Sequence, residues 1–236
     1  MIAMKSVPAA PVPQVGTAPP GDARRGVPAA KPLLRGWMHL VWFEASLVVG
    51  TLTLARMHGT LKITAVAVFT GSVSAMFGTS ALYHRGNWRA AWRRRLQRLD
   101  HAMIFLLIAG TATPAFLLAT SGFFRLAGLI GIWVLTAAAT GIRMAWMRAP
   151  ELVAGGTFVG LGWAAGLSLP GVWLHAGAVP GVLMIVGGLL YTAGALSYHW
   201  RRPDPCPAVF GYHEVFHVYV CAAAACQYAA IALFIA

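Results

Sequence analysis

Seven apolar runs of about twenty residues follow one another along this chain, separated by short polar connections. A run of this length crosses the roughly 30 Å of hydrocarbon in a bilayer as a helix, and helices are required because lipid offers no partner for backbone N–H and C=O groups. The sequence therefore predicts an all-α membrane protein, a bundle of seven transmembrane helices. The expected spans are residues 37–56, 62–84, 99–120, 123–146, 151–174, 178–200 and 210–235.

Composition agrees with this fold class, since 58% of the 236 residues are hydrophobic and 10% are charged. Residues 1–31 are rich in Pro, Ala and Gly and lack an apolar core, which predicts a disordered cytoplasmic tail in front of a membrane domain over residues 32–236. The three cysteines cannot form a paired framework and are expected to be free thiols.

The chain carries 18 Lys and Arg against 6 Asp and Glu. The cations fall in the short connections and form no contiguous basic face, so nucleic acid is not an expected partner. If the N-terminus is cytoplasmic, 15 cations lie inside and three, Arg56, Lys62 and Arg125, lie outside. The cytoplasmic excess of cations orients membrane helices. We therefore expect a multi-pass protein of the cell membrane with its N-terminus in the cytoplasm and its C-terminus outside.

Four metal-binding or acidic side chains within the spans are expected at one membrane depth. His84 closes the second span, Asp100 opens the third, and His213 and His217 open the seventh. The end of an even-numbered span and the starts of odd-numbered spans lie on the same side, here the cytoplasmic one. His213 and His217, four residues apart, also project from one helix face. The sequence predicts a metal site near the cytoplasmic face.

Three neutral imidazoles with one open position form a known catalytic zinc environment, in which bound water acidifies towards neutrality. Asp100 would be the outer partner of the site, as a hydrogen-bond acceptor or general base. Ser80, one turn before His84, would orient water or stabilise a developing oxyanion. Imidazole also suits other divalent metals, so the ligand set alone does not select zinc.

Each of these residues also has a structural explanation. A histidine pair can bridge helices or lie at the headgroup boundary, and Ser80 can be a packing hydroxyl. Asp100 can cap the third span, and Glu214 is expected to complement the helix dipole in the first turn of the seventh. His101 faces away from Asp100 by about 100° and is expected at an interface.

Two polar residues of the first span complete the candidates. For Glu44, two turns into the span, a cavity-facing carboxyl and a protonated, packed carboxyl both remain open. His39 is expected at the membrane interface.

These motifs resemble the haemolysin III family, the bacterial branch of the adiponectin and progestin receptor-like membrane proteins. The resemblance covers nearly all of residues 31–236. It is carried in order by residues 31–37, 80–84, 99–101, 110–114, 202–205 and 211–217.

This resemblance implies a seven-helix fold with a cytoplasmic N-terminus and a zinc ion held by His84, His213 and His217. Asp100 matches the family position that holds the zinc-bound water, and Ser80 matches the family serine. The same pattern lies near the alkaline ceramidases, in a wider set of proposed membrane metallohydrolases. Many relatives carry a first-helix motif that Glu44 and His39 do not reproduce, so no first-helix role is carried over.

Several functions remain open on this basis. The first is a zinc-dependent hydrolase that cleaves an amide or ester bond in a membrane lipid entering laterally from the bilayer. The second is a non-enzymatic sensor of membrane lipid composition with structural zinc. A cytolysin-like pore ranks third, because the polar groups cluster at one end of the spans and do not line a continuous path. Proton-coupled transport ranks below these, since no second polar cluster lies near the outer face.

Overall fold

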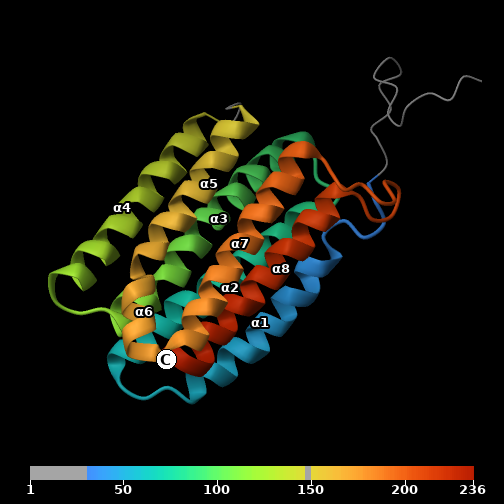
Figure 1. The fold of residues 1–236 in the computed structure, drawn as a ribbon. Helices are drawn as coiled ribbons and strands as arrows, with labels where there is room; N and C mark the ends of the chain where they lie inside the picture. The colour runs from blue at the N-terminus through green and yellow to red at the C-terminus, as the bar shows by residue number, and fades with distance from the viewer. Residues whose placement is uncertain (1–30, 147–149) are drawn as a thin grey trace, which may run out of the picture. The chain divides into compact units, whose positions relative to one another are not determined.

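A computed structural model describes residues 31–146 and 150–236. Apart from Lys31, the expected tail over residues 1–31 lies outside the described residues, as does Arg148. The chain is 85% helical and, among the described residues, has no strand and seven helices long and apolar enough to cross a membrane. The predicted fold class is therefore confirmed (Figure 1). The helices are α1 (Trp37–Ala55), α2 (Thr60–Arg85), α3 (Ala90–Ala119), α4 (Gly122–Ala145), α5 (Glu151–Ala165), α6 (Leu169–Ala176), α7 (Ala178–Trp200) and α8 (Tyr212–Ala230).

Helices α2, α3 and α8 form the centre of the membrane domain. Half or more of the apolar stretch of each is buried (56%, 61% and 50%), against 11% for α4, which lies at an edge beside α3 and α5 (Figure 1). Large side chains such as Phe69 and Phe77 of α2 fill this centre. Helix α1 packs against α2 and α8, and α7 packs against α8. The ends of α2 and α8 are thereby held close together.

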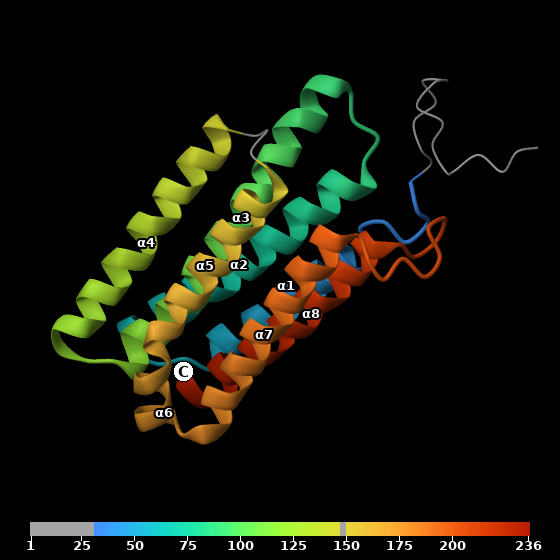
Figure 2. The same cartoon turned by 45° about the horizontal axis from the view of Figure 1, so that its top comes forward.

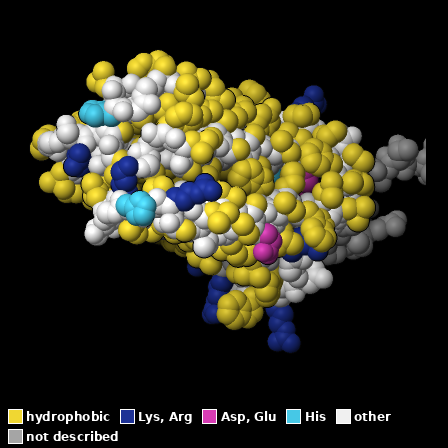
Figure 3. All heavy atoms as spheres, turned by 90° about the horizontal axis from the view of Figure 1, so that it is seen from below, with side chains coloured by type: hydrophobic (Ala, Val, Ile, Leu, Met, Phe, Trp, Pro, Cys, Tyr) yellow, Lys and Arg dark blue, Asp and Glu magenta, His cyan; other side chains and the backbone are white. Residues whose placement is uncertain are grey.

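The fifth expected span consists of two helices and a short joint. A 3₁₀ turn, Gly166–Ser168, connects α5 to α6, and the combined span runs over Leu152–Ala176, so it continues past Pro170. At the other end of the chain a π-helical turn, Ile231–Ile235, extends α8. Hydrophobic side chains cover most of the face seen in Figure 3, as expected of a surface that meets lipid. All three cysteines are free.

Helix α3 begins nine residues before its expected start. Its 30 residues make it about 45 Å long at 1.5 Å per residue, well beyond the roughly 30 Å of hydrocarbon. The additional turns hold Arg93, Arg94 and Arg95, which are all exposed. In Figure 2 the start of α3 extends past the end of α2. Asp100 is thus an interior residue of α3, and a capping role for it is wrong.

The segment before α1 is bound to the loop before α8. The N–H groups of Leu33 and Leu34 donate to the carbonyls of Ala208 and Val209 at 3.0 and 3.1 Å. Figure 1 shows this segment, in blue, beside the loop in orange and red. Gly36 follows with a φ of 79°, and a Cβ placed there would lie 2.8 Å from Cβ of His84. The positive φ and the close approach together require glycine, and they bring α1 against the end of α2.

Candidate metal centre

Three histidines meet where α2 ends and α8 begins. One ligand atom from each of His84, His213 and His217 lies within 4.8 Å of the others. The Nε2 atoms of His84 and His213 are 3.3 Å apart, and the rings of His213 and His217 have centroids 4.6 Å apart. His217 is 1% exposed and His84 9%. The convergence expected from the sequence is therefore present, between residues more than 120 positions apart.

The first turn of α8 holds His213 and His217 on one face. Glu214 lies between them, is fully buried, and its Oε2 accepts the N–H of Gly211 at 2.9 Å. This is the first-turn position expected for it. Its other oxygen accepts from Nε of Arg35, in the segment before α1. The ion pair fixes the start of α8 against the chain that leads into α1, which the sequence did not indicate.

Asp100 approaches the histidines from α3. Its Oδ2 lies 3.9 Å from Nε2 of His84, and its side chain is 13% exposed. The carboxyl also interacts with the Ser80 side chain. Asp100 is therefore next to the histidine cluster without belonging to the three converging ligands, the position expected of an outer partner.

His39 is part of the site, and the expectation that it lies at the membrane interface is wrong. It is 2% exposed, and its ring stacks on that of His217 with centroids 3.7 Å apart and planes 15° apart. Its Nδ1 lies 2.8 Å from Oγ of Ser80, one turn before His84. A single histidine gives no spacing signal, but its place two residues inside α1 sets it at the depth of His84.

Glu44 and His101 are not part of the cluster. Glu44 is exposed on α1, so neither the cavity-facing nor the packed explanation holds for it. His101 faces α4, where its Nδ1 lies 3.2 Å from Nη2 of Arg143. Both results follow from helix geometry, since neighbouring residues on α3 point about 100° apart.

The donor set fits a divalent cation. Two nitrogens bound to zinc at about 2.0–2.1 Å in a tetrahedral arrangement lie about 3.3 Å apart, which matches the separation of the His84 and His213 Nε2 atoms. Nδ1 of His217 is buried and has no hydrogen-bond partner among the described residues. Buried polar nitrogens without partners are costly, and a cation at the convergence point would offset this cost. His84, His213 and His217 are the residues that could hold it.

Comparison with known proteins relates this chain to one family. The sequence model of the family described as "Haemolysin-III related" matches residues 28–228, which include every residue of the cluster. The "Hemolysin-3 homolog" of Bacillus subtilis (strain 168) is 22% identical over 166 residues, covering 70% of this chain and 75% of the relative. The "Hemolysin-3" of Bacillus cereus is 24% identical over 182 residues, covering 77% and 80%.

Proposed function

Because the chain belongs to the haemolysin III-related family and is a multi-pass membrane protein, we propose that it is a zinc-dependent hydrolase of the cell membrane. Its substrate is an amide or ester bond of a membrane lipid. The observation that carries the proposal is the convergence of three buried imidazoles beside the carboxyl of Asp100 at one end of the bundle. With the N-terminus in the cytoplasm, this end lies near the inner leaflet.

His84, His213 and His217 would hold the metal. Zinc in such a site supplies an acidified water and polarises a carbonyl oxygen. Asp100, 3.9 Å from the His84 ring, accepts a proton from the attacking water and returns it to the leaving amine or alcohol. Ser80 lies between His39 and Asp100 and orients the reacting groups through its hydroxyl.

The remaining contacts position these groups. His39 stacks on His217 and bonds to Ser80, so it limits the rotation of both side chains. Arg35 and Glu214 hold the first turn of α8, on which two of the ligands lie. A lipid whose scissile carbonyl reaches this depth from the bilayer would meet groups that are already oriented, which reduces the entropic cost of reaction.

A structural metal in a sensor of lipid composition is the second candidate. It is favoured by the burial of the cluster, because a cation held by the nearly inaccessible His217 ties α2 to α8 and contributes folding free energy. A pore is the third candidate and is less favoured, since Phe69, Phe77 and Phe116 fill the bundle.

Turnover of defined lipids by the purified protein tests the proposal. The parent should release fatty acid from a ceramide or a phospholipid in mixed micelles, and His213→Ala should abolish release. Asp100→Asn should keep the metal and lose about 10²–10⁴-fold in rate, because it removes the proton acceptor alone. His58→Ala, at an exposed histidine in the α1–α2 connection, is the matched control and should retain parent activity. A metal-loaded parent without turnover on either lipid class would favour the sensor instead.

A further inference from the structure

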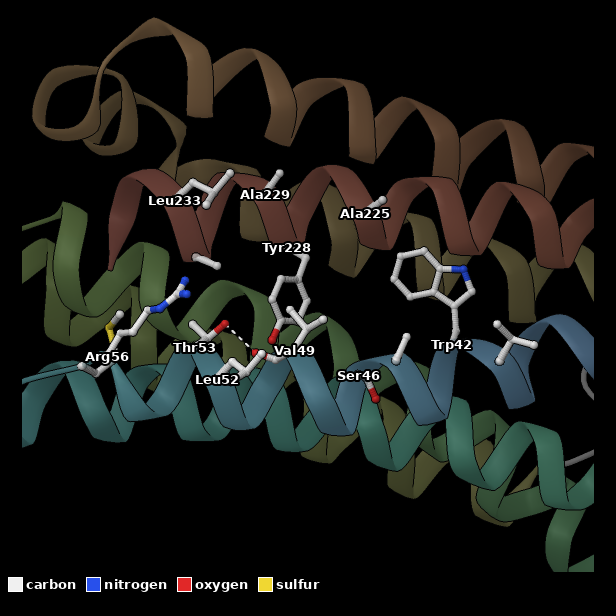
Figure 4. A pocket seen from close by; sticks show the side chains of 14 residues that line it. Trp42, Ser46, Val49, Leu52, Thr53, Arg56, Ala225, Tyr228, Ala229 and Leu233 are labelled. Atoms are coloured by element: carbon white, nitrogen blue, oxygen red, sulfur yellow. Dashed lines mark hydrogen bonds between the residues drawn. The ribbon is translucent and has the colours of Figure 1, made fainter.

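A groove of about 470 Å³ runs between α1 and α8, away from the histidine cluster (Figure 4). Along α1 it extends from Trp42 to Arg56, about 21 Å at 1.5 Å per residue. Its walls are mostly apolar, and small side chains of α8 form its floor. The residues used below are Trp42, Val49, Thr53, Ala225, Ala229 and Leu233.

Two polar groups without partners lie towards one end of this groove. The Tyr228 side chain points from α8 towards α1 (Figure 4); it is 9% exposed, and its hydroxyl has no hydrogen-bond partner among the described residues. Arg56 lies at the end of the groove, and its guanidinium forms no hydrogen bond or ion pair within the described part of the chain. The neighbouring cation differs, because Nζ of Lys62 donates to the carbonyl of Ala236 at 2.6 Å.

The two groups are arranged in order of depth. The Tyr228 hydroxyl lies 3.6 Å from the position of a Cβ built on Gly50, so it is level with that residue. Gly50 precedes Arg56 by six residues, about 9 Å along α1. From the end of the span inwards, the groove therefore presents a cation, then a hydroxyl donor, then an apolar channel that ends at Trp42.

We propose that this groove binds one anionic phospholipid of the leaflet opposite the histidine cluster. Its phosphate pairs with Arg56 at the membrane boundary, and a glycerol ester carbonyl, which lies deeper, accepts a hydrogen bond from Tyr228. One acyl chain then follows the channel past Val49 and Ala225 to Trp42. The site is separate from the proposed hydrolytic centre, since Arg56 follows His39 by 17 residues, about 25 Å along α1.

Other occupants match these groups less well. A neutral lipid would leave the guanidinium unpaired, and a free fatty acid held by Arg56 would place no acceptor at Tyr228. A helix about 10 Å wide and 21 Å long would need roughly 1,600 Å³, several times the volume of the groove. A phosphate, an ester and one chain account for all three features.

Native mass spectrometry of the purified full-length protein tests the proposal. Dioleoyl phosphatidylglycerol should bind in a single tight equivalent, in preference to phosphatidylcholine, diacylglycerol or oleate. Arg56→Gln should weaken binding about fivefold, the effect of about 1 kcal/mol for one basic residue near a charged headgroup. Tyr228→Phe should weaken it about three- to fivefold through the lost hydrogen bond. Ala225→Trp, which fills the channel, should prevent tight binding.

Matched controls are Arg93→Gln, at an exposed arginine outside the groove, and Ala138→Trp, at an exposed alanine of α4. Both should bind phosphatidylglycerol like the parent, and thermal unfolding should show that all variants remain folded. The proposal is overturned if Arg56→Gln and Ala225→Trp bind like their controls, or if oleate or diacylglycerol competes equally with phosphatidylglycerol. None of these results depends on lipid turnover, so failure here leaves the proposed function intact.

Discussion

Replacing Arg35 by alanine should destabilise the protein by leaving a buried carboxylate without its ion-pair partner. Glu214 is fully buried, and Arg35 is 23% exposed. The remaining hydrogen bond to Glu214 comes from the N–H of Gly211, which belongs to the helix cap. The carboxylate cannot reach water without disrupting the first turn of α8, so the loss of the guanidinium is not compensated by solvation.

The expected magnitude follows from the burial of the two partners. Removing one partner of a buried ion pair costs about 3–5 kcal/mol. The partial exposure of Arg35 and the surviving Gly211 hydrogen bond place this pair at the lower end, about 3 kcal/mol. For a chain of this length, 1 kcal/mol shifts the melting temperature by about 2–4 °C, so Arg35→Ala should lower it by about 6–12 °C.

Thermal unfolding in detergent, followed by circular dichroism, measures this shift. Glu214→Gln removes the charge and keeps an oxygen for the Gly211 N–H, so the double variant Arg35→Ala/Glu214→Gln should be more stable than Arg35→Ala alone. Arg93→Ala, at an exposed arginine of α3, should change the melting temperature by less than about 2 °C. The reasoning is refuted if Arg35→Ala behaves like Arg93→Ala, or if the double variant melts at or below the temperature of Arg35→Ala.

Three further changes have defined outcomes. Gly36→Ala should cost about 1–3 kcal/mol in unfolding free energy and weaken metal retention, because it forces a positive φ and a contact with the Cβ of His84; denaturation and metal titration measure both. His39→Phe should retain more metal than His39→Ala, since phenylalanine preserves the stacking on His217 while losing the bond to Ser80. Chelation with EDTA should lower the melting temperature of the parent, and zinc should restore it; a His84→Ala variant should respond to neither treatment.

Most of the helical architecture could be predicted from hydrophobicity. The sixth span, expected over residues 178–200, coincides with α7, and the first ends one residue from its expected end. The exception is the start of α3. Residues 90–98 are too basic for lipid, so a span assignment excludes them, yet Ala, Leu, Gln and Arg are good helix formers and continue the helix outside the hydrocarbon.

The candidate site was predictable only where helix spacing or topology pointed to it. His213 and His217 are one turn apart on α8, and the count of spans places His84 and Asp100 at their depth. The contacts of His39 depend instead on how α1 lies against α2 and α8. That placement follows from backbone hydrogen bonds of Leu33 and Leu34 and from the Arg35–Glu214 pair, none of which has a periodic signature.

Metal content of the purified protein tests the central claim most directly. Elemental analysis of the parent should find about one zinc ion per chain, His84→Ala should lose it, and the control His58→Ala should retain it. A parent that binds no divalent cation after zinc loading, or a His84→Ala variant with full occupancy, would contradict the claim that the imidazoles of α2 and α8 form a metal centre.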